Sequence, residues 1–348
     1  PTGLKIFVYP KENSNSTYAV FGTKYGSVDT CFKRSDEADS CTVPEGIAHF
    51  LEHKLFENED CDAFARYAKT GASANAYTSF DTTCYLFSCT ENVYESLEIL
   101  LDFVQSPYFT EQTVEKEQGI IGQEIQMNAD TPETVVFENL MGLMYENHPI
   151  NTPILGTKES IAQITPEVLQ QCHKAFYTPE NMLLCVVGDV DAEEIRETAV
   201  RLLPQNPPHT VEKETWQEPM TVLQPEITCK MEVAMPMFQL GFKCEPQDRG
   251  EKAVRLEMVG DLAAEALFGE SSSLYLELYE KGIIDSSFGG GIETLDGMAI
   301  LTCSGDSDDP WAVRDAVLTR ARQLVQEGVK EEDFLRMKRS VLGRRIKD

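Results

Sequence analysis

The stretch from Gly46 to Glu57, GIAHFLEHKLFE, carries three residues that can do metal chemistry: His49, Glu52 and His53. In a helix, residues at i, i+3 and i+4 share one face, so two imidazoles and a carboxylate would point the same way. Neutral imidazole is a common zinc ligand, and a pair four residues apart can hold one ion from one side. The carboxylate could be a ligand or a general base, and its place beside the second histidine favours activation of water. The order His-x-x-Glu-His is the reverse of the commoner His-Glu-x-x-His order.

The alternative for this helix is a polar cluster of the core without a metal. Most of the other faces are apolar, so the polar groups would be largely buried and would need partners. Two of the five histidines of the chain lie here. The apolar positions are Ile47, Phe50, Leu51, Leu55 and Phe56.

A third ligand has to come from another element, and the stretch from Glu115 to Gln126, EKEQGIIGQEIQ, is the best candidate. Glu117 and Glu124 are seven residues apart, so two helical turns bring both carboxylates to one face. Glycine weakens a helix by roughly 1 kcal/mol relative to alanine, so a packing reason is expected for the two glycines between these carboxylates. We expect Gly119 and Gly122 to let a second helix approach closely. Other carboxylates compete for the third ligand position: Glu111, Glu115 and Glu138.

Length and composition indicate a two-domain protein without nucleic-acid or membrane partners. A chain of 348 residues exceeds what one core usually organises. Thirty basic against 58 acidic side chains give a net charge of −28, which disfavours nucleic acid and anionic membranes and favours cationic ligands. The alternative explanation of this charge is solubility alone. Ten cysteines without a CxxC pair predict reduced thiols in the cytoplasm. The sequence contains no membrane-spanning apolar run, and the segment PTGLKIFVYPKEN lacks a signal-peptide core.

The periodicity of the first half predicts an α+β domain. We expect a strand meander, then the helix of the histidine motif, a second short helix closed by Gly71, a hairpin, further helices and a buried strand. The strands are expected at 4–9, 17–25, 27–32, 72–79, 82–90 and 182–187, and the helices at 62–69, 91–105, 111–128, 131–145, 161–176 and 192–203.

The second half repeats this order without repeating the sequence, which indicates a duplicated α+β unit. We predict a first domain at 1–205, a linker at 206–225 rich in Pro, Glu and Thr, and a second domain at 226–348. The second domain holds no histidine, so a site of the same kind is not expected there. Its strands are expected at 227–234, 238–244, 286–292 and 298–304, and its helices at 251–268, 273–281 and 310–326.

Four stretches of the chain read HFLEH, EKEQGIIGQE, GASANAYTSFDTTCY and FYTPENMLLCVVGDVD. In these stretches the chain resembles the pitrilysin and insulysin family of inverted-motif zinc metallopeptidases, which includes the mitochondrial processing peptidases. The resemblance is strong over residues 1 to about 205 and looser to the end. Within the family the chain is most similar to bacterial proteins associated with 5-aminopentanol modification of elongation factor P.

The resemblance implies a fold and a set of roles. Each domain would be a mainly antiparallel sheet packed by helices. His49, His53 and Glu124 would hold zinc, Glu52 would activate water, and Glu117 would orient a ligating imidazole. An edge strand would pair with extended peptide substrate through the segment Asn75, Ala76 and Tyr77.

The second half departs from the family pattern. In the active partners of this family, an arginine and a tyrosine often occur in the corresponding stretch. This chain reads LYEKGIID there, with Tyr279 and Asp285 at the matching places. We therefore expect a partner subunit, homologous or identical, to complete the substrate pocket. The second domain also looks truncated, short of the family's usual end by a strand and a helix.

Together these observations predict a cytoplasmic bacterial zinc endopeptidase subunit that cleaves extended peptides, with a preference for basic ones. The alternative is a non-hydrolytic, zinc-containing binding or assembly subunit. Glu52 separates the two, because a structural zinc site has no use for a base and takes four protein ligands.

Overall fold

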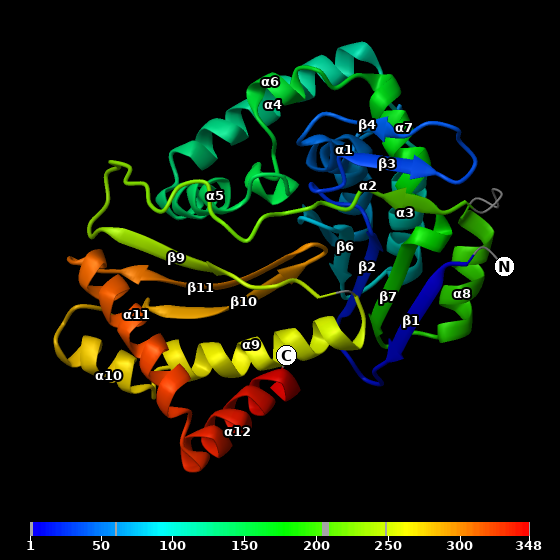
Figure 1. The fold of residues 1–348 in the computed structure, drawn as a ribbon. Helices are drawn as coiled ribbons and strands as arrows, with labels where there is room; N and C mark the ends of the chain where they lie inside the picture. The colour runs from blue at the N-terminus through cyan, green and yellow to red at the C-terminus, as the bar shows by residue number, and fades with distance from the viewer. Residues whose placement is uncertain (1–2, 60, 204–208, 248, 348) are drawn as a thin grey trace. The chain divides into compact units, whose positions relative to one another are not determined.

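The computed structural model describes residues 3–59, 61–203, 209–247 and 249–347 (Figure 1). The chain forms two compact units: unit 1 comprises Pro1–Met127 and Thr152–Glu214, and unit 2 comprises Asn128–Asn151 and Thr215–Asp348. The expected change from domain to linker at 205 and 206 lies outside the described residues. Residues 128–151, which include His148, belong to unit 2, whereas the expected division places them in the first domain. A histidine is therefore present in unit 2 although residues 226–348 have none.

Unit 1 is built on a five-stranded sheet in the order β1-β7-β2-β6-β5. β1 runs parallel to β7, and the other neighbours are antiparallel. The expected meander of the first three strands is wrong, because β7 from far along the chain lies between β1 and β2. The apolar faces of β2 and β7 are both fully buried, and this match outweighs closeness in sequence. The strands are β1 (Lys5–Pro10), β2 (Thr17–Thr23), β5 (Ser73–Thr78), β6 (Thr83–Cys89) and β7 (Met182–Gly188).

A smaller sheet in unit 1 has the order β4-β3-β8. It contains β3 (Cys31–Arg34), β4 (Cys41–Thr42) and β8 (Val211–Lys213). The third strand of the expected meander is therefore part of a different sheet. β8 lies inside the segment expected to be a linker, and it pairs antiparallel with β3.

Helices pack on the large sheet of unit 1. The core that they share contains Phe21 and Tyr85 from the sheet and Phe103 from a helix. The single helix expected at 161–176 is two, because Thr165 caps a new helix that has Pro166 in its first turn. The expected hairpin of β5 and β6 is present. The helices are α1 (Ile47–Leu55), α2 (Ala63–Thr70), α3 (Val93–Gln105), α4 (Glu111–Ala129), α6 (Lys158–Ile161), α7 (Pro166–Phe176) and α8 (Ala192–Leu202), with a 3₁₀ turn at Pro179–Asn181.

Unit 2 has a three-stranded antiparallel sheet in the order β10-β11-β9 with helices packed on it. The strand expected at 227–234 is absent, and this segment has no regular structure and exposes Ile227 and Val233. The elements are α5 (Pro132–Met144), a 3₁₀ turn at Pro149–Asn151, β9 (Met237–Lys243), α9 (Glu251–Phe268), α10 (Ser273–Glu280), β10 (Gly289–Leu295), β11 (Met298–Asp306), α11 (Pro310–Glu327) and α12 (Glu331–Lys347).

Two further features bear on the class of protein. Cys84 and Cys89 on β6 are free thiols, as are seven other cysteines of the described residues. Among the described residues, none of the helices combines the length and apolar character needed to cross a membrane.

Candidate metal centre

The position of helix α1 is set by a close backbone contact at its start. Gly46 precedes the helix with φ 85°, a left-handed conformation that favours glycine. A Cβ at this position would lie 2.3 Å from the carbonyl oxygen of Leu155 and 3.0 Å from Cα of Gly156. The hydroxyl of Ser160 donates to the carbonyl oxygen of Glu45 at 2.9 Å. The loop before α6 therefore contacts Gly46, which lies three residues before His49. This contact fixes where α1 begins.

One side of α1 is anchored in the core, and the other side carries the polar groups. Phe50 and Leu51 are fully buried. His49 and Glu52 are also buried, at 7% and 8% exposed, and His53 is partly exposed. Because polar groups this deeply buried are normally satisfied, they need partners from another element.

Helix α4 brings two carboxylates beside the histidines. Nδ1 of His53 lies 3.0 Å from Oε1 of Glu117, which is a hydrogen bond. Nε2 of His53 lies 3.6 Å from Glu124, and Nε2 of His49 lies 3.7 Å from the other oxygen of Glu124. These last two distances are too long for hydrogen bonds. The two carboxylates that share a helical face thus have different contacts with the histidines.

The three groups fit a zinc ion by the spacing of their donor atoms. His49, His53 and Glu124 each offer a ligand atom within 4.8 Å of the others. Ligands about 2.0–2.1 Å from a tetrahedral zinc are about 3.3 Å apart. The observed nitrogen–oxygen distances are 3.6 and 3.7 Å, each to a different oxygen of Glu124, so the carboxylate presents one oxygen to each imidazole. Two nitrogens and one oxygen leave one tetrahedral position open, as in catalytic rather than structural sites.

The protonation states of the two imidazoles are set by burial and by their carboxylate neighbours. Burial lowers the pKa of His49 to about 3, and the neighbouring His53 contributes, so the ring stays neutral. Burial also acts to lower the pKa of His53, but its hydrogen bond to Glu117 and three nearby carboxylates outweigh burial and raise that pKa. The contact to Glu117 directs Nε2 of His53 toward Glu124. Nδ1 of His49 is buried without a hydrogen-bond partner among the described residues.

Glu52 has the environment of a proton-transfer group. Burial raises the pKa of its carboxyl group, although the Thr78 hydrogen bond and the neighbouring His53 act in the opposite direction. The Thr78 hydroxyl donates to Oε2 of Glu52 at 2.7 Å, which orients the carboxylate from β5. A carboxyl with a raised pKa is better able to accept and return a proton near neutral pH.

The site opens into a cleft of about 490 Å³ within unit 1. Glu52 and His53 from α1, Asn75 and Ala76 from β5, and Glu117 from α4 are among its lining residues. The cleft therefore adjoins the edge strand on one side and the carboxylate helix on the other.

The predicted peptide-binding residues lie on β5, which pairs only with β6 among the described residues and so forms one edge of the sheet. Ser79 donates its N–H to the carbonyl of Thr82 at the hairpin turn. By the alternation of an antiparallel ladder, the backbone groups of Ala76 then point away from β6. The N–H of Ala76 donates to Oδ1 of Asn75 at 2.9 Å, and the side chain of Tyr77 is half exposed.

Two expectations about α4 have different outcomes. The competing carboxylates Glu111 and Glu115 are exposed, and Glu138 belongs to unit 2, so the described group contains Glu124 alone of these four. The expected packing reason for the glycines of α4 is wrong. A Cβ at Gly119 or Gly122 would meet nothing within 4 Å, so no close helix approach requires glycine there.

Three residues that shape the site were not predicted from the sequence. Lys54 is fully buried, and its ammonium group binds Glu57 and lies 3.4 Å from the carbonyl oxygen of Thr113 in α4, which ties α1 to α4. Thr78 could have been found from strand alternation, since it faces the helix while Tyr77 faces away. No sequence signal marks the backbone contact at Gly46.

The two positions that depart from the family pattern have local contacts in unit 2. Tyr279 is half exposed and stacks on Tyr275 with ring centroids 5.7 Å apart. Oδ1 of Asp285 accepts from the backbone and the hydroxyl of Ser287. Neither contact reveals a catalytic role.

The chain has two α+β units, and in one of them a His-x-x-Glu-His helix faces a helix that carries two glutamates. This arrangement places the fold in the class of two-domain metallopeptidases. The profile "Insulinase (Peptidase family M16)" matches residues 42–158, and "Peptidase M16 inactive domain" matches 163–341. The first match contains His49, Glu52, His53 and Glu124.

Comparison with individual proteins agrees with these profiles. The Bacillus subtilis protein named "Uncharacterized zinc protease YmfH" is 45% identical over 331 residues, covering 93% of this chain and 77% of YmfH. A crystal structure described as an M16-like peptidase, from Alicyclobacillus acidocaldarius, is 34% identical with a TM-score of 0.94, covering 99% of this chain and 82% of that one. The Arabidopsis thaliana protein named "Probable mitochondrial-processing peptidase subunit beta, mitochondrial" is 32% identical over 162 residues, which cover 45% of this chain and 30% of that protein.

The chain spans less than half the length of four other bacterial relatives named zinc proteases. The match to YmfH nevertheless extends along nearly the whole chain. This protein belongs to the insulinase family of peptidases, M16.

Proposed function

We propose that this chain is the zinc-binding subunit of an endopeptidase that hydrolyses extended peptides. His49, His53 and Glu124 are the proposed zinc ligands, and Glu52 is the proposed catalytic base. The observation that carries the proposal is the buried carboxylate of Glu52 beside three ligand groups that leave a fourth position open.

When bound, zinc supplies a Lewis acid that polarises a carbonyl group and lowers the pKa of water. Glu52 accepts the proton of the attacking water and returns it to the leaving amine, and the raised pKa of its carboxyl suits this exchange. Thr78 holds the carboxylate of Glu52 in position through its hydroxyl. Glu117 fixes the tautomer and ring orientation of His53 through the bond to Nδ1.

Substrate binding is proposed to occur by β-addition to β5. An extended peptide would hydrogen-bond to the outward-facing backbone groups of Ala76. It would displace the Asn75 side chain, which now accepts a hydrogen bond from the N–H of Ala76. Tyr77 would contact side chains of the peptide. Because main-chain bonds dominate this mode, selectivity between sequences is expected to be limited.

A partner chain is proposed to complete the substrate pocket. Tyr279 and Asp285 replace residues that the family pattern places in active partners, which supports this proposal. A relative bears the name of a processing-peptidase subunit, which agrees with it. Cytoplasmic location in a bacterium is part of the same proposal, and the free cysteines support it.

The proposal is tested by comparing wild type with E52Q in a peptide-library digest, with and without chelator, alone and with copurifying protein. E52Q is expected to keep one zinc per chain and to lose about 10²- to 10⁴-fold in activity, because a neutral amide cannot accept the proton. E115Q is the matched control, since Glu115 is exposed and outside the metal group. Full activity in E52Q, or no zinc after zinc-supplemented expression, would refute the mechanism.

A further inference from the structure

Unit 2 repeats the arrangement of elements that forms the metal centre in unit 1. In unit 1 the order is β2, α1, β5, β6 and α4, and β6 pairs antiparallel with both β2 and β5. In unit 2 the order is β9, α9, β10, β11 and α12, and β11 pairs antiparallel with both β9 and β10. Helix α1 packs on β5, and helix α9 packs on β10 and on α12. Helices α9 and α12 therefore correspond to α1 and α4.

Charged residues of unit 2 occupy positions like those of the metal ligands in this scheme. Glu257 and Asp261 are four residues apart on α9, as His49 and His53 are on α1. Arg345 on α12 follows a glycine by two residues. Glu124 on α4 does the same. The pattern is thus two carboxylates and a guanidinium in place of two imidazoles and a carboxylate.

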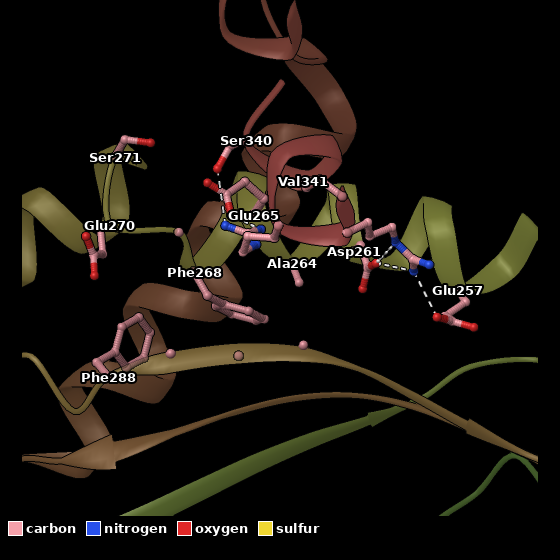
Figure 2. A pocket seen from close by; sticks show the side chains of 16 residues that line it. Glu257, Asp261, Ala264, Glu265, Phe268, Glu270, Ser271, Phe288, Ser340 and Val341 are labelled. Atoms are coloured by element: carbon pink, nitrogen blue, oxygen red, sulfur yellow. Dashed lines mark hydrogen bonds and ion pairs between the residues drawn. The ribbon is translucent and has the colours of Figure 1, made fainter. Parts of the chain in front are cut away.

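The guanidinium of Arg345 binds both carboxylates. Its Nη2 lies 2.8 Å from Oε1 of Glu257 and 2.6 Å from Oδ2 of Asp261, and its Nε donates to the same oxygen of Asp261 at 3.2 Å. Figure 2 shows Glu257 and Asp261 projecting from α9, with dashed lines at both carboxylates that mark ion pairs and hydrogen bonds. Next to it, Arg344 bonds Glu265 at 2.7 Å. These groups line a cavity of about 920 Å³.

The position that would hold a catalytic base is closed in unit 2. Gly260 follows Glu257 by three residues, as Glu52 follows His49. A Cβ at Gly260 would lie 2.3 Å from Cδ1 and 2.7 Å from Cβ of Ile292 on β10. The close packing of α9 on β10 therefore leaves no room for a carboxylate side chain there.

We propose that the guanidinium of Arg345 is a built-in cation that takes the place of a metal ion in unit 2. It is bound by Glu257 and Asp261, and it holds α12 on α9 without any metal. This proposal rests on the proposed metal centre of unit 1, with which unit 2 is compared. The consequence is that unit 2 keeps the helix pair of a metal centre but binds no ion.

The test is hydrogen exchange of α12 in the full chain, for wild type and R345M, with and without millimolar Mn²⁺. In R345M the two carboxylates face each other without a cation, so α12 is expected to exchange about tenfold faster, as for the loss of two partly exposed ion pairs. Mn²⁺ is expected to restore protection, because paired carboxylates with water suit this ion. The matched control R344M loses the neighbouring ion pair and is expected to show no response to Mn²⁺.

The nearly isosteric variant E257Q/D261N, with Arg345 intact, is expected to lose protection of α12 without any response to Mn²⁺. Unchanged exchange in R345M, no restoration by Mn²⁺, or equal restoration in R344M would each overturn the proposal. The readout is confined to α12, so a failure of zinc to bind at His49 and His53 would refute the proposed function while leaving these exchange results in place.

Discussion

Replacing Gly46 with alanine is expected to destabilise the start of α1 and to weaken zinc binding. The left-handed backbone, φ 85°, costs a non-glycine residue about 1–2 kcal/mol. The added Cβ would also lie 2.3 Å from the carbonyl oxygen of Leu155, and such overpacking costs about 1–3 kcal/mol. The contacted atoms are backbone, which cannot rotate away, so the total expected loss is about 2–5 kcal/mol.

Gly71→Ala is the matched control. Gly71 caps α2 with φ 77°, and a Cβ there meets nothing within 4 Å. It therefore carries the conformational cost of about 1–2 kcal/mol without the steric cost. Hydrogen exchange of peptides covering α1 in G46A and α2 in G71A measures both losses within unit 1. Both tryptophans, Trp216 and Trp311, belong to unit 2, so their fluorescence would not report on these changes.

The steric difference of about 1–3 kcal/mol corresponds to about 5- to 150-fold faster exchange in G46A relative to G71A. Zinc affinity is expected to fall in G46A and to stay unchanged in G71A, because His49 lies three residues beyond Gly46. Equal losses of protection in the two variants, or unchanged zinc affinity in G46A, would refute the idea that the Leu155 contact sets the position of α1.

Three further predictions concern the site, the core and the substrate. E124A is expected to lose far more zinc affinity than E117A, whose loss is about 10- to 100-fold, and equal small effects by metal titration would redirect the search for the third ligand. Burial lowers the pKa of His173 to about 4, below its unfolded value, so the unfolded state takes up a proton that the folded state resists. His173 should then lower the free energy of unfolding by about 3 kcal/mol as pH drops from about 6.5 to about 4, so in urea titrations H173Q should show a pH dependence smaller by this amount, while the contribution of buried His49 remains. Cleavage of basic peptides is expected to weaken between about 0.05 and 0.5 M salt, because the Debye length shortens about threefold, and salt-insensitive kinetics would contradict charge steering.

Local signals in the sequence were sufficient to predict the elements that carry the site. The spacing of His49, Glu52 and His53 predicts one helical face, and the structure has a helix at Ile47–Leu55. The seven-residue spacing of Glu117 and Glu124 predicts a shared face of α4, and both carboxylates do lie near the histidines. The helix end at Gly71 and the hairpin of β5 and β6 are also found. Such features depend on neighbours in sequence, which periodicity and turn residues encode directly.

Long-range pairing was not predictable in the same way. β7 lies between β1 and β2 because two apolar faces match. No residue near Thr17–Thr23 indicates that β7 is the partner strand. The apolar run at 227–234 has strand composition, yet it forms no strand in the structure. Strand propensity describes a fit to a half-buried pleated surface, so it cannot decide whether such a surface is available.

For the site, the sequence by itself determined which groups can bind a metal and move a proton, because chemistry follows from residue type and spacing. Only the tertiary structure decided which carboxylate faces which imidazole: Glu117 bonds Nδ1 of His53, and Glu124 lies between the two Nε2 atoms. It also decided that Gly46 sets the helix start and that Arg345 binds the carboxylates of α9. The physical reason is that these contacts join segments far apart in the chain, whose approach depends on packing of the whole unit.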